Sequence, residues 1–134
     1  MKMLKRILFV ATVAIGCLLP SLATAETWDD GNVVWRYFPL EGSTTEARLG
    51  DGSNACVAVT AEGGLTLPNQ IGQYKVTTLS ANAFAGCAKI TGVTLPENLE
   101  TVEEGAFDGA SALKSIDVSK RNESFFSVNG ALYA

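Results

Sequence analysis

The sequence predicts an α/β solenoid, that is, a short array of repeated units in which each unit packs against its neighbours. The main observation is that two consecutive stretches of equal length, 76–98 and 99–121, carry the same apolar pattern. Each large apolar residue of the first unit recurs at the same place in the second, as Leu79 does at Val102. A fixed period of about 20 to 50 residues is typical of repeat arrays, whose units bury their apolar faces against each other. Such arrays mostly present a surface, so the period favours binding over catalysis.

Residues 26–60 do not follow this period, and we expect them to form an N-terminal β cap. The stretch 32–38 is rich in β-branched and aromatic residues, which favours a strand. Shorter apolar stretches at 47–49 and 55–59 follow turn signals, so the region is predicted to be a β meander. A meander of this kind would shield the open edge of the first repeat.

The densest aromatic group of the chain lies in this cap and consists of Trp28, Trp35, Tyr37 and Phe38. Exposed aromatic side chains can anchor a sugar or a protein, because they bury a large area on binding. The alternative is that these side chains cover the edge of the first repeat. We favour the second interpretation, in which the group belongs to the core.

Residues 61–134 form the predicted repeat region, in which each full unit contains one turn and one strand. The segment 80–87 carries Ala and Phe at helix-compatible spacing and includes a closing glycine, which predicts a short helical or 3₁₀ turn. The alternating apolar residues that follow predict strands at 90–95 and, one unit later, at 113–118.

An incomplete earlier unit precedes the two full units, because Leu65 matches Val93 across a spacing wider than the period. The five additional residues fall within 69–75 and predict an excursion between strands. Near the end of the chain, Asn129-Gly130 between two apolar runs predicts a C-terminal β-hairpin. With two full units and no polar closing cap, we expect the N-terminal part of a longer array or a truncated copy.

Residues 1–25 predict a signal peptide that is cleaved after Ala25. They begin with three basic residues, continue with an apolar run at 7–19 and end with small residues before the cleavage site. A membrane anchor would need about 20 unbroken apolar residues, and this run is shorter. Lipidation at Cys17 is a second alternative, but the apolar run continues past this residue. We therefore expect a secreted or cell-surface protein with no integral membrane segment after cleavage.

Removal of the leader also changes the charge of the chain, because the leader contains three of the ten basic residues and none of the fourteen acidic ones. Seven basic and fourteen acidic residues are then left, which gives a net charge of −7. Nucleic-acid binding relies on basic surfaces for most of its nonspecific affinity. The charge therefore argues against nucleic acids and anionic membranes as partners.

The residue types that catalysis most often uses are sparse in this chain. It has no histidine, which removes the common general base near neutral pH and the histidine-based nucleophile and zinc sites. Beyond the leader it has two cysteines, Cys56 and Cys87, for which buried free thiols are favoured over a disulfide. A weak calcium site at 51–54 is less favoured than a plain turn, because the full ligand spacing is absent. We therefore predict no enzymatic activity, no cofactor and no metal.

The residues that carry the period also resemble a known family. The segments 82–87, Asn-Ala-Phe-Ala-Gly-Cys, and 90–96, Ile-Thr-Gly-Val-Thr-Leu-Pro, are similar to BspA-type leucine-rich repeats. This family occurs in exported and cell-surface proteins of bacteria and some protists. The resemblance implies a right-handed leucine-rich-repeat solenoid with parallel strands at 90–95 and 113–118. It also implies adhesion to host proteins, matrix or other cells.

Together these observations predict an exported leucine-rich-repeat module that mediates protein–protein or cell-surface adhesion and has no catalytic role. Alternation along the strands points Thr94, Ser115 and Asp117 outward, which makes them candidate binding residues. Two alternatives are an accessory repeat module of a larger secreted enzyme and a truncated gene fragment without independent function. Exposed strand edges at the C-terminal end would also allow self-association.

Overall fold

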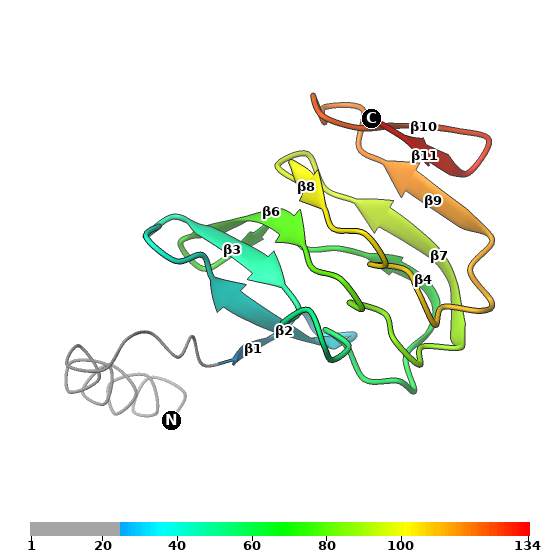
Figure 1. The fold of residues 1–134 in the computed structure, drawn as a ribbon, viewed down its shortest axis with the longest axis horizontal. Helices are drawn as coiled ribbons and strands as arrows, with labels where there is room; N and C mark the ends of the chain where they lie inside the picture. The colour runs from blue at the N-terminus through cyan, green and yellow to red at the C-terminus, as the bar shows by residue number, and fades with distance from the viewer. Residues whose placement is uncertain (1–24) are drawn as a thin grey trace.

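A computed structural model describes residues 25–134 as a stack of strands (Figure 1). The expected α/β class is wrong, because these residues contain eleven strands and no helix. The predicted signal peptide, apart from Ala25, lies outside the described residues. The strands are, in chain order, β1 (Glu26–Asp29), β2 (Val34–Pro39), β3 (Glu46–Leu49), β4 (Glu62–Thr66), β5 (Gln70–Ile71), β6 (Tyr74–Leu79), β7 (Lys89–Leu95), β8 (Thr101–Val102), β9 (Ser115–Val118), β10 (Phe126–Val128) and β11 (Ala131–Tyr133).

Two parallel ladders form the body of the molecule. β3, β6 and β8 make the first ladder, and β4, β7 and β9 make the second. The chain passes from the first ladder to the second in each successive coil, from β3 to β4, from β6 to β7 and from β8 to β9 (Figure 1). The 23-residue period is the offset between the last two strands of each ladder, since Leu79 pairs with Val102 and Val93 pairs with Ile116.

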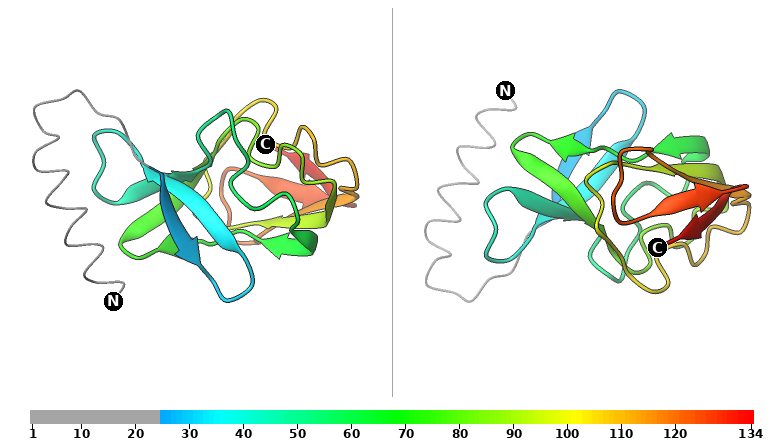
Figure 2. Two further views of the ribbon diagram at one scale, coloured as in Figure 1. Left: turned by 90° about the horizontal axis from the view of Figure 1, so that it is seen from below. Right: turned by 90° about the horizontal axis from the view of Figure 1, so that it is seen from above.

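The inward-facing side chains of both ladders share one apolar core, around which the strands curl (Figure 2). In β7, Val93 and Leu95 are buried, whereas Thr94 between them is only partly buried. This alternation is expected of a strand that packs one face against a core and turns the other face outward.

The coil that begins at β3 is longer than the next one, as the wider spacing from Leu65 to Val93 predicts. Leu65 of β4 pairs with Val93 of β7, so the second ladder keeps its register across the insertion. The additional residues form a tight antiparallel connection between β5 and β6, in which Ile71 pairs with Tyr74. The insertion is therefore a local hairpin that leaves the coils aligned.

The segment 80–87 does not form the predicted helical turn. It consists of turns, in one of which the Ala83 N–H donates to the Ser80 carbonyl at 3.3 Å. Asn82 has a φ of 57°, which interrupts any right-handed helical run. Its backbone N–H donates to the Gly105 carbonyl of the next coil at 3.0 Å. Within the segment, the N–H groups of Ala83, Ala85 and Cys87 each donate to the carbonyl three residues earlier, whereas the N–H groups of Asn82 and Phe84 donate to the next coil. The segment is therefore a series of separate turns and not a continuous helical turn.

The stretch 55–59 is not the predicted strand either. It occupies the corresponding turn position of the preceding coil, where the Cys56 N–H donates to the Ala83 carbonyl at 2.7 Å. The Cys56 carbonyl accepts a hydrogen bond from the Arg36 N–H at 2.7 Å. Cys56 thus links β2 to the turn of the next coil, and Cys56 and Val57 are buried in the core, whereas Ala58 and Val59 are exposed.

The N-terminal strands cover only the first ladder. β1 pairs with β2 and β2 pairs with β3, both antiparallel, so β2 occupies the outer edge of β3. Trp35 and Tyr37 of β2 are 0% and 2% exposed, and Phe38 is also buried. Trp28 is partly buried against the same core. The interpretation of the aromatic group as core is therefore confirmed.

The last two strands form an antiparallel hairpin around Asn129-Gly130, both of which have positive φ. This hairpin lies against β9, where the Ile116 N–H donates to the Gly130 carbonyl at 2.8 Å and the Val118 N–H donates to the Ser127 Oγ at 3.1 Å. The edge of the second ladder at β9 is therefore covered.

Candidate functional site

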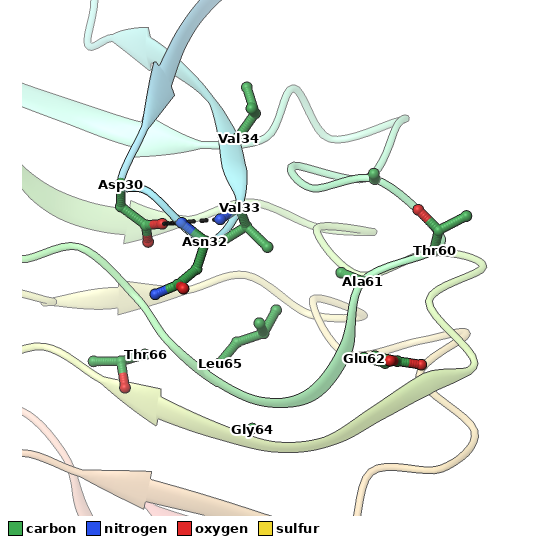
Figure 3. A pocket seen from close by; sticks show the side chains of 11 residues that line it. Asp30, Asn32, Val33, Val34, Thr60, Ala61, Glu62, Gly64, Leu65 and Thr66 are labelled. Atoms are coloured by element: carbon green, nitrogen blue, oxygen red, sulfur yellow. Dashed lines mark hydrogen bonds between the residues drawn. The ribbon is translucent and has the colours of Figure 1, made fainter.

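A groove lies between the turn that joins β1 to β2 and the open edge of β4 (Figure 3). Its volume is about 790 Å³, which is within the range of about 300 to 1,000 Å³ typical of ligand sites. One wall belongs to the cap and the other belongs to β4. The lining includes Asp30, Val33, Val34, Glu62, Leu65 and Thr66.

Asp30 holds the cap side of the groove in its conformation. Its Oδ1 accepts hydrogen bonds from the backbone N–H groups of Asn32 at 2.8 Å and Val33 at 2.9 Å, and its Oδ2 accepts one from Trp35 Nε1 at 2.9 Å. Desolvation raises the pKa of Asp30, but the hydrogen bonds from Trp35 and the two backbone groups outweigh it and hold the pKa below its ordinary value. Asp30 is therefore a carboxylate at neutral pH, and its three donors are all uncharged.

Apolar side chains contribute to both walls of the groove. Val33 and Leu65 project into the space between the cap turn and β4 (Figure 3). Leu65 is 7% exposed, whereas Val34 on the cap wall is 49% exposed. The groove therefore offers apolar contact area beside the acidic side chain of Asp30.

The backbone of β4 forms the other wall and pairs with β7 on one side only, within the part of the chain that the structure describes. In a parallel ladder, consecutive residues direct their backbone groups alternately to the two sides. The Leu67 N–H donates to the Thr94 carbonyl at 3.0 Å, so the alternation directs the backbone groups of Thr66 and Gly64 away from β7. A Cβ added at Gly64 would meet no atom within 4 Å, so the space over this residue on its face of the sheet is open.

The three predicted binding residues lie on the second ladder, and two of them align with the groove. Asp117 is in register with Thr94, and Thr94 is in register with Thr66 at the groove. Ser115 instead lies under the C-terminal hairpin, because its Cβ is 3.0 Å from the position of a Cβ added at Gly130. The structure thus brings Thr94 and Asp117 together in one row and separates Ser115 from it.

Sequence reasoning missed the groove itself, because its two walls come from separate parts of the chain. The only local signal is Gly63-Gly64, two residues without side chains at the start of a strand. Glycine in a strand often marks a place where another backbone approaches closely. That signal points to an unobstructed strand edge, but it does not show what lies opposite.

Within residues 25–134, no group of three or more Cys, Asp or Glu side chains is arranged to hold a metal ion. The same part of the chain contains no helix with the length and hydrophobicity needed to cross a membrane.

The fold and the groove define a repeat protein, in which stacked coils carry two parallel ladders and the outer strand β4 has an unpaired edge beside the groove. Residues 64–129 match the family model described as the BspA type leucine rich repeat region. The repeat region of this chain therefore belongs to the BspA-type leucine-rich repeat family, as the sequence motifs predict.

Two solved structures of bacterial proteins resemble the chain. A leucine rich cell surface protein from Faecalibacterium prausnitzii A2-165 aligns with a TM-score of 0.53 and 16% sequence identity, over 78% of this chain and 26% of that protein. The pneumococcal vaccine antigen PcpA aligns with a TM-score of 0.38 and 15% identity, over 84% of this chain and 54% of PcpA. The first similarity supports the fold, and the chain spans about a quarter of that protein's length. No curated protein matches the chain.

Proposed function

We propose that this chain is an exported, non-catalytic leucine-rich-repeat module that mediates adhesion by binding a protein or a cell-surface ligand. The observation that carries the proposal is the row formed by Thr66, Thr94 and Asp117, which crosses the three strands of the second ladder and begins at the groove. These side chains are held on hydrogen-bonded strands, so a ligand would meet a surface that is already ordered. Binding to an ordered surface loses less conformational entropy than binding to a mobile one.

Two further observations support the exported, surface-directed part of this proposal. Residues 1–25 have the pattern of a signal peptide. The repeat region belongs to the BspA-type family, and the fold is similar to that of a bacterial leucine rich cell surface protein.

The test compares the adhesion of beads coated with the purified protein to intact cells and to cells treated with protease. The variant Thr94→Arg/Asp117→Lys should reduce adhesion by about tenfold or more, because it places two cations in the proposed contact surface. The matched control is Thr27→Arg/Glu104→Lys, which makes the same charge change at two exposed residues that do not line the groove. Loss of adhesion after protease treatment would identify a protein ligand.

Adhesion that does not exceed that of uncoated beads on any cell type would overturn the proposed function. Equal adhesion of the two double variants would show that the outer face of the second ladder is not the contact surface.

A further inference from the structure

The open edge of β4 suggests how a partner would be held. Resting on the binding function proposed above, we propose that the groove takes an extended, positively charged peptide segment of a partner protein. This segment pairs with β4 as an additional strand of the second ladder. Recognition of this kind draws affinity from main-chain hydrogen bonds and specificity from alternate side chains.

The first reason is that β4 has an unpaired edge at the groove. β2 covers β3, and the C-terminal hairpin lies against β9 through hydrogen bonds from Ile116 and Val118. Among the described strands, β1, β5, β8, β10 and β11 also have a single paired neighbour, but none of their residues lines the groove. β4 has five residues and a neighbour on one side. Unpaired backbone groups along such an edge are a template for another strand.

The second reason is that the groove leaves room for a further strand beside β4. The groove of about 790 Å³ lies along this edge, and a Cβ added at Gly63 or Gly64 would meet no atom within 4 Å. An approaching backbone would therefore meet no side chain at these two positions. Alternate side chains of the added strand could contact the apolar walls at Val33 and Leu65, which project into the groove (Figure 3).

The third reason is charge. Asp30 and Glu62 line the groove, and neither forms an ion pair with another residue in the described part of the chain. The Asp30 carboxylate is bound by uncharged donors, so its negative charge is not neutralised. A strand with Lys or Arg side chains is the complementary occupant. A second copy is disfavoured, because residues 26–134 carry a net charge of −7 and two copies would repel each other.

The experiment uses two synthetic peptides as probes, one with alternating Val and Lys and one in which Glu replaces every Lys. Binding to the full chain is measured by fluorescence anisotropy at low and high salt. The Lys peptide should bind at least about tenfold more tightly than the Glu peptide, and salt should weaken its binding. Glu62→Gln should weaken the Lys peptide and reduce the salt dependence.

The matched variants Thr66→Pro and Thr66→Val separate strand addition from simple charge attraction. Proline removes the N–H that points into the groove but leaves the ladder bonds to β7, whereas valine keeps that N–H. Thr66→Pro should abolish peptide binding, whereas Thr66→Val should weaken it far less, because valine changes the side chain but keeps the backbone donor. If the proline variant does not fold, hydrogen exchange on the unmodified protein gives the answer, since bound peptide should slow exchange at Gly64 and Thr66 by about tenfold or more.

Each result has a definite meaning. Peptide binding that survives Thr66→Pro, or that leaves exchange at Gly64 and Thr66 unchanged, would overturn strand addition. If the Lys peptide does not bind more tightly than the Glu peptide, the proposal of a positively charged partner segment is overturned. If the coated beads adhere to cells while no peptide binds, the proposed function stands and this inference fails. If edge-dependent peptide binding occurs without cell adhesion, the inference stands and the proposed function fails.

Discussion

The rings of Phe84 and Phe107 stack nearly parallel across neighbouring coils, with ring centroids 5.6 Å apart and ring planes inclined by 6°. The two residues occupy the same position in consecutive units of the repeat. Their burial nevertheless differs, since Phe84 is fully buried and Phe107 is only partly buried. Among residues 25–134, Phe84 packs between two coils, whereas the coil of Phe107 packs against the coil of Phe84.

This difference predicts unequal losses of stability. Phe84→Ala should lower the free energy of unfolding by about 3 to 5 kcal/mol, the usual effect of removing a buried aromatic ring. Phe107→Ala should lower it by about 1 to 2 kcal/mol, because less apolar area is removed from the core. Urea unfolding followed by circular dichroism measures both values. Equal losses at the two positions would contradict the burial pattern.

Of two glycines with similar φ, Gly109 is predicted to lose more stability on replacement than Gly42. Its φ is +89°, and an added Cβ would lie 2.6 Å from the Gly86 nitrogen of the preceding coil. Gly42 has a φ of +78°, but an added Cβ there would meet nothing within 4 Å. Gly42→Ala should cost about 1 kcal/mol from the left-handed conformation alone. Gly109→Ala should cost at least about 2 kcal/mol more, because the coils must also separate.

Thermal and urea unfolding of the two variants provide the measurement, and Gly42→Ala is the internal control for the effect of φ. A loss at Gly109 no larger than the loss at Gly42 would show that the turns of neighbouring coils are not in close contact.

The coil length and the pairing of equivalent residues could be predicted from the sequence, because both follow from which residues must face the core. The spacing that relates Leu79 to Val102 is the offset between β6 and β8, and the spacing from Leu65 to Val93 is the offset between β4 and β7. The strand at 90–95 was predictable for the same reason, since Val93 and Leu95 alternate with Thr94. The strands β6 and β8 themselves were missed, because only one strand was predicted in each full unit.

The class of the fold and the groove could not be predicted in this way. Local spacing at 80–87 suits a helical turn, but the N–H groups of Asn82 and Phe84 donate to the next coil, and these bonds depend on a neighbour that local spacing does not reveal. The candidate residues Thr94 and Asp117 follow from alternation, whereas Asp30 and Thr66 become neighbours of one groove only through the tertiary fold. Tertiary contacts thus override local preference at the turns and create the groove between distant segments.

Cys56 and Cys87 are free and completely buried, as predicted for two core thiols. Desolvation raises the pKa of both thiols, and the nearby Cys87 raises that of Cys56 further. Because the thiolate is the reactive form, neither residue should react with iodoacetamide at pH 8 in the folded protein. Both should react in urea, and mass spectrometry of the labelled peptides identifies each site. Rapid labelling of Cys56 in the folded protein would contradict its burial.

Cys87→Ala should be tolerated with a small loss of stability, because Ala110 occupies the corresponding position of the next coil and is also buried. The expected loss is about 1 to 2 kcal/mol for the removed sulfur contacts. Cys87→Leu is the comparison, since a larger side chain should destabilise the same site by overpacking.

Asp51 is predicted to make stability depend on pH in the acid range. Hydrogen bonds from the Asn54 side chain and from the backbone N–H groups of Asn54 and Ser53 lower its pKa from 3.8 to about 2. A carboxyl group whose pKa is lower in the folded state stabilises the fold above its unfolded pKa, and this contribution is lost as the pH falls. The difference in unfolding free energy between the unmodified protein and Asp51→Asn should therefore shrink between about pH 4 and pH 2.

The direct measurement is the midpoint of the Asp51 carboxyl resonance in an NMR titration. Asn54→Ala removes the donor with the largest effect, so it should move this midpoint from about 2 toward 3.8. The side-chain bond from Asn54 Nδ2 to Asp51 Oδ2 is 3.0 Å long, and the two backbone bonds to Oδ1 remain in the variant. The shift should therefore be partial. A midpoint near 3.8 in the unmodified protein would mean that the three donors do not hold the carboxylate in solution.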